Sequence, residues 1–84
     1  MATNDKYQKI ITTIIKAQEE ILGPLAKDIA NDIPNLDQPD KKTLEDLVKK
    51  YADIFGQASV ETCKEAARDL LSSFSQDDIP DILK

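Results

Sequence analysis

Residues 7–24 read YQKIITTIIKAQEEILGP, and this stretch decides the fold class of the chain. Its large apolar residues recur at spacings of three and four, which places them on one side of a helix. The isoleucines favour a strand when taken singly, but the spacing outweighs their individual preference. Gly23-Pro24 then joins the end of one helix to the start of the next, because glycine ends helices and proline begins them.

The same helical period continues along the rest of the chain. We expect four helices joined by short connections, over about residues 5–22, 24–32, 43–55 and 59–74. Thr43 and Ser59 are the expected N-caps of the last two helices, and Gly56 ends the third. Leu25 and Ile54 fall among the apolar positions that we expect these helices to bury. The sequence predicts an all-α fold: a compact four-helix bundle, or four helices plus a short C-terminal turn, in one domain over residues 1–84.

Charge and composition exclude several classes of partner. The 84 residues contain 16 acidic and 11 basic side chains, giving a net charge of −5. Binding to nucleic acid or to an anionic membrane surface needs a basic face, and none emerges, so we expect neither partner. The chain has no apolar run long enough to span a membrane and no signal-peptide pattern, and Cys63 is its single cysteine. These features predict a cytoplasmic protein without an internal disulfide.

Histidine, the commonest catalytic base and the commonest metal ligand, is missing. The chain contains no histidine, and its only glycines, Gly23 and Gly56, form no phosphate-binding loop. Cys63 lies within an apolar stripe and has no base to activate it, so we expect a buried structural thiol. The acidic residues lack the spacing of a calcium loop. We therefore predict no catalytic, cofactor-binding or metal-binding residues and no enzymatic activity.

Two segments are candidates for binding another protein. The first is the isoleucine face of the first helix, with Gln18 in its middle. Gln18 either reaches solvent or a nearby backbone group, or it is a buried polar group that fixes the register of two helices, within the chain or between two copies. The second is the apolar C-terminal tail, which either packs back over the bundle or docks on a partner. The candidate partner-binding residues are Ile10, Ile14, Gln18, Ile21, Ile79, Ile82 and Leu83.

Two segments of the chain resemble known families. The segment from Gly56 to Thr62, followed by an acidic helix, resembles the serine-bearing helix of acyl carrier proteins, which would imply phosphopantetheine on Ser59. The helix N-cap role explains the same serine without modification. The run from Ile21 to Ala30, with the leucines at 44, 47, 70 and 71, resembles a small helical domain of uncharacterised function in bacterial, notably cyanobacterial, signalling proteins. That resemblance implies an interaction module.

The sequence therefore favours a non-enzymatic function. We expect an acidic helical module for protein–protein interaction or regulation in bacterial signalling, and the chain could also form a homodimer. An acyl-carrier-like protein modified on Ser59 is one alternative. An acidic mimic of nucleic acid that blocks a basic groove is another, because the net charge alone fits it. The identity of the protein partner does not follow from the sequence.

Overall fold

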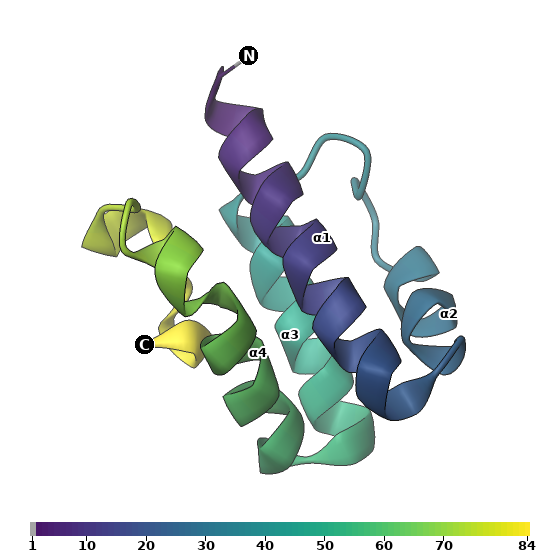
Figure 1. Ribbon diagram of the computed structural model, residues 1–84. Helices are drawn as coiled ribbons and strands as arrows, with labels where there is room; N and C mark the ends of the chain where they lie inside the picture. Colours follow the sequence, from purple (N-terminus) through teal and green to yellow (C-terminus); the bar gives the residue numbers. More distant parts are fainter. Residues whose placement is uncertain (1) are drawn as a thin grey trace.

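The longest element, α1 (Ala2–Leu22), packs against each of the other three helices. The computed structural model describes the backbone of residues 2–84 and the side chains of residues 6–84. After a turn at Gly23, whose φ is +68°, α2 (Leu25–Asn31) runs back along the C-terminal half of α1 (Figure 1). The turn thus has the left-handed backbone conformation that favours glycine.

The second half of the chain adds two longer helices and a short tail. A loop leads to α3 (Lys41–Phe55), and α4 (Gln57–Leu71) follows at once and runs back beside α1 and α3 (Figure 1). Two short 3₁₀ turns, η1 (Gln76–Asp78) and η2 (Asp81–Leu83), end the chain. No strand occurs over residues 2–84. The all-α prediction of a four-helix bundle with a C-terminal turn is confirmed.

The N-caps of the last two helices differ from the prediction. Asp40, not Thr43, caps α3: its Oδ1 accepts from the Thr43 backbone N–H and from the Thr43 hydroxyl, both at 3.0 Å. The Asp40 backbone N–H donates to Thr43 Oγ1 at 3.2 Å, so the two residues form a reciprocal capping box. For α4 the cap position is Gly56, at φ +85°, and Ser59 lies one turn inside the helix. Both helices therefore begin two residues earlier than we expected, α3 at Lys41 and α4 at Gln57.

Replacing Asp40 with alanine should lower the free energy of unfolding by about 1 kcal/mol, because the Thr43 backbone N–H at the start of α3 then loses its hydrogen-bond acceptor. The Thr43 backbone hydrogen bond holds the pKa of Asp40 below its usual value, so this contribution is lost as the pH falls through that lowered pKa. Urea unfolding at pH 7 and at pH 3 measures both effects. Asp37→Ala, an exposed change in the same loop, is the control, and an equal loss in that variant would contradict the capping role.

One core joins the four helices and the η2 turn. The C-terminal tail belongs to it, since η2 packs against α3 and α4. At the opposite end of the sequence, Tyr7 contacts Phe74 edge to face, with ring centroids 5.2 Å apart, and its hydroxyl donates to the Asp78 carbonyl at 2.9 Å. Lys6 Nζ lies 2.8 Å from Asp78 Oδ2 and 4.7 Å from the centroid of the Phe74 ring. The N-terminal half of α1 is thereby held against the last residues of the chain.

Candidate functional site

Most of the predicted binding face of the first helix lies inside the bundle. Ile10, Ile14 and Gln18 are buried, because α2, α3 and α4 surround this stripe. The prediction that these three residues present a surface to a partner therefore needs correction. Ile21, at the end of the same stripe, is 64% exposed. The stripe is core over most of its length and surface only in its last turn.

Gln18 is a buried polar link between two helices of one chain. Its Nε2 donates to the Ser59 carbonyl at 3.2 Å and to Cys63 Sγ at 3.3 Å, both on α4. No buried side-chain nitrogen or oxygen within residues 6–84 lacks a hydrogen-bond partner. Gln18 is therefore buried and does not reach solvent, and its two hydrogen bonds link α1 to α4.

The C-terminal tail is also part of the core. Ile79 and Leu83 are buried, and Ile82 is half-buried against the same cluster. Burial of this tail confirms the alternative in which it packs back over the bundle. As a consequence, Ile79, Ile82 and Leu83 do not form a free docking segment in the folded chain.

The chemistry of the buried groups does not favour covalent modification. The Cys63 thiol is fully buried, and burial raises its pKa to about 11 although the hydrogen bond from Gln18 acts the other way. At neutral pH it is therefore a thiol and a poor nucleophile. Ser59 is 6% exposed, so it offers little of its surface to a carrier-type transferase. No cluster of acidic, histidine or cysteine residues in the described part of the chain has the arrangement of a metal site.

Among the side chains of residues 6–84, three large apolar ones are exposed, and all three lie at one end of the bundle. They are Ile21 at 64%, Leu25 at 47% and Ile54 at 51% exposure. Figure 1 shows why they share that end: α1 and α3 finish there, and α2 and α4 begin there. A small pocket of about 210 Å³ at the same end is lined in part by Leu22, Phe55 and Ala58. We call Ile21, Leu25 and Ile54 the apolar end.

Two members of the apolar end differ from the sequence-based expectation. We expected Leu25 and Ile54 to be buried, but both are about half exposed. Each lies in the turn of helix next to a glycine junction, Gly23 or Gly56, where no further helix extends to cover it. The sequence feature that could have indicated their exposure is their position beside these two glycines.

A groove between α1 and α4 opens beside the apolar end. It has a volume of about 510 Å³ and shares Ile21 with that end. Its walls carry three glutamates, Glu20 from α1 and Glu61 and Glu65 from α4, and no lysine or arginine lines it. We call this feature the α1–α4 groove; its lining residues are Ala17, Glu20, Ile21, Glu61, Thr62, Glu65 and Ala66.

Two other grooves have a different character. One of about 510 Å³, between α4 and the C-terminal tail, is lined by Lys64, Arg68 and Lys84 together with apolar residues. The other, of about 340 Å³, lies between α1 and α2, where Glu19 already pairs with Lys27 at 3.8 Å. Neither of them includes a residue of the apolar end.

Comparison with family models, with curated proteins and with solved structures finds no match to this chain. The resemblance to the helical domain of signalling proteins therefore stays a prediction. Within the residues that the structure describes, no helix has both the length and the hydropathy needed to cross a membrane.

Proposed function

We propose that this chain is a non-enzymatic protein-binding module, and that its apolar end is the surface on which a partner docks. The observation that carries this proposal is the exposure of Ile21, Leu25 and Ile54 at one end of an otherwise well-buried bundle. Single exposed apolar residues are common, but several at one end are typical of an interaction surface. Burying them against a partner would recover the hydrophobic free energy that the isolated fold leaves unused.

Several finer parts of the function are proposals of the same kind. A regulatory role in bacterial signalling follows from the sequence resemblance, and a cytoplasmic location from the single unpaired cysteine. A homodimer would be the simplest partner, and light scattering over a hundredfold concentration range tests it. If the partner proves to be a DNA-binding protein with a basic groove, the alternative of a nucleic-acid mimic gains support.

Ile21→Asp should abolish partner binding and leave the bundle folded, because a charge at the exposed apolar end opposes burial in an interface. The tagged protein and the variant are each used to capture proteins from extracts of the cells that produce it, and captured proteins are compared by quantitative mass spectrometry. A specific partner is one that the unchanged chain captures and Ile21→Asp does not. Its dissociation constant is then measured with the purified protein.

Gln8→Asp is the matched control, because it adds the same charge to an exposed position near the other end of α1. That variant should capture the same partner as the unchanged chain. Circular dichroism must show the same helical signal for all three proteins. Equal capture by Ile21→Asp, with the fold intact, would reject the apolar end as the docking surface.

A further inference from the structure

The three glutamates of the α1–α4 groove form no salt bridge with any side chain that the structure describes. Among the side chains of residues 6–84, Glu20, Glu61 and Glu65 form no salt bridge, and the only polar side-chain contact among them is a 3.4 Å hydrogen bond from the Gln57 amide to Glu61. Other acidic residues have cationic partners; Asp78, for example, lies 2.8 Å from Lys6. The negative charge along this groove is therefore not neutralised by the fold.

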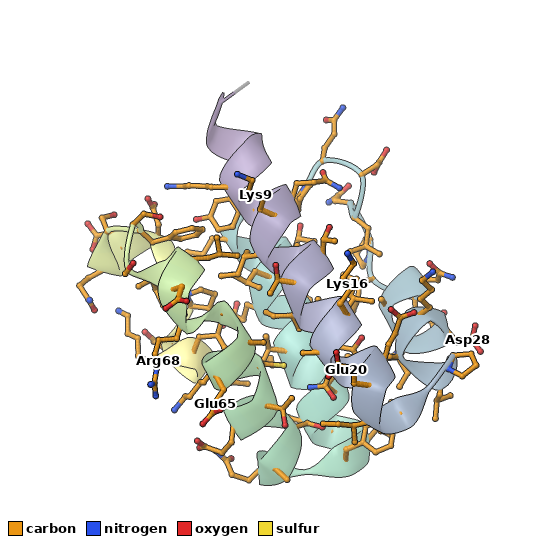
Figure 2. All side chains as sticks on the ribbon, viewed as in Figure 1. Lys9, Lys16, Glu20, Asp28, Glu65 and Arg68 are labelled. Atoms are coloured by element: carbon orange, nitrogen blue, oxygen red, sulfur yellow. The ribbon has the colours of Figure 1, made fainter. Side chains whose placement is uncertain are left out.

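The spacing of Glu61 and Glu65 adds to this charge. They are four residues apart on α4, where like charges repel and weaken the helix. Lys64 and Arg68, each three residues after one of these glutamates, form no salt bridge with them and line a groove on the side of α4 that faces the tail. Figure 2 shows Glu20 on α1 and Glu65 and Arg68 on α4, with Arg68 farther from α1 than Glu65 is. The arrangement costs stability and leaves a negative groove.

The floor of the groove suits close packing of a helix. Ala17 and Ala66 are small and half-buried, and Ile21 stands exposed at one end. Small residues let a partner helix approach, and Ile21 offers an apolar contact next to the carboxylates. A partner segment that matches this surface has an apolar face toward the floor and basic residues toward the walls.

We propose that the α1–α4 groove binds a basic amphipathic helix of a partner protein. Its apolar side chains pack on Ala17, Ala66 and Ile21, and its lysines or arginines pair with Glu20, Glu61 and Glu65. This inference rests on the proposed protein-binding function and names the chemistry of the partner. A second copy of the chain is a poorer occupant, because a symmetric contact through this groove would set the same three carboxylates against themselves.

A designed peptide tests the inference directly. The probe is a fluorescently labelled helix of about 15 residues, long enough to span the groove, with leucines on one face and lysines on the other. Anisotropy titration gives its dissociation constant, and ¹⁵N–¹H shift changes locate it on the protein. We expect saturable, salt-sensitive binding, with shifts at residues 17–21 of α1 and 61–66 of α4. The same peptide with glutamate at every lysine position should not bind.

Charge-reversal variants of the protein distinguish binding in the groove from non-specific electrostatic attraction to a negatively charged protein. Glu65→Lys should weaken binding of the lysine peptide at least about fivefold. It should also raise the midpoint of urea unfolding, because a pair of opposite charges then replaces the like-charge pair on α4. Asp28→Lys makes the same change of net charge on an exposed residue of α2, outside the groove (Figure 2), and should weaken binding less than about twofold. Equal effects of the two variants, binding of the glutamate peptide, or shifts confined to other surfaces would overturn the inference.

Capture from cell extracts distinguishes failure of this inference from failure of the proposed function. If Ile21→Asp loses its partner while a Glu20→Lys, Glu65→Lys variant keeps it, the partner is not basic and only the inference is wrong. If both variants keep every partner, the protein-binding surface itself is wrong. A dimer in light scattering that Glu65→Lys strengthens would also overturn the inference, since a second copy would then occupy the groove.

Discussion

Ile14→Asp is expected to unfold the protein at neutral pH. Ile14 is fully buried within the cluster that joins α1 to the other helices, and it has no cationic neighbour in that cluster. An unpaired carboxylate there costs more than about 4 kcal/mol. A domain of this length has a total stability of about 4–13 kcal/mol, so the cost equals or exceeds the lower part of that range. Far-ultraviolet circular dichroism at pH 7 measures the result as loss of the helical signal.

Ile21→Asp provides the matched control for that experiment, because it makes the same substitution one heptad further along the same helix. Ile21 is largely exposed, so the aspartate stays hydrated and the helical signal should remain. A folded Ile14→Asp protein with unchanged helical content would mean that the isoleucine stripe is not the core of the bundle.

Raising the pH from 9 to 12 is expected to remove about 5 kcal/mol of stability. Burial raises the pKa of Tyr51 from 10.0 to about 12, and burial raises that of Cys63 from 9.0 to about 11. The unfolded chain releases these two protons at lower pH than the folded chain does. Because the unfolded state then binds fewer protons, the free energy of unfolding falls with pH across this window, by about 3 kcal/mol for each group.

Urea unfolding at half-unit intervals of pH measures this loss, and two variants assign it. Tyr51→Phe removes the fall between pH 10 and 12, although it also leaves the Ala26 carbonyl without the 2.8 Å hydrogen bond from the tyrosine hydroxyl. Cys63→Ala removes the fall between pH 9 and 11. The slope with pH, not the stability at neutral pH, is the quantity to compare. Unchanged slopes in both variants would show that neither buried group controls alkaline unfolding.

The period of the apolar residues was enough to predict the helices. The glycine junctions at Gly23 and Gly56 were located correctly, since both have positive φ angles that favour glycine. Glu45 and Lys49, four residues apart on α3, pair at 3.8 Å, because neighbours one turn apart meet by local geometry. Lys50, by contrast, lies 3.8 Å from Asp32 in the loop after α2 and makes no salt bridge with Asp46. Local spacing predicts which contacts are available, and tertiary neighbours compete for them.

The candidate site was much less predictable. The sequence singled out Gln18 as unusual, and the structure buries it against α4, but its partners Ser59 and Cys63 lie 41 and 45 residues away. Nothing in the local pattern identifies such distant acceptors. Likewise, the sequence did not single out Glu20, Glu61 and Glu65, which line one groove only because the fold places α1 beside α4.

The sequence by itself determined the fold class, the turns and the direction in which each helix points its apolar side chains. Only the tertiary structure decided that Ile14 is core whereas Ile21, Leu25 and Ile54 are surface. The physical reason is that a helical period fixes where a side chain lies around the helix axis, and it carries no information on how far a neighbouring helix extends along that axis. Exposure at the end of the bundle depends on that second quantity.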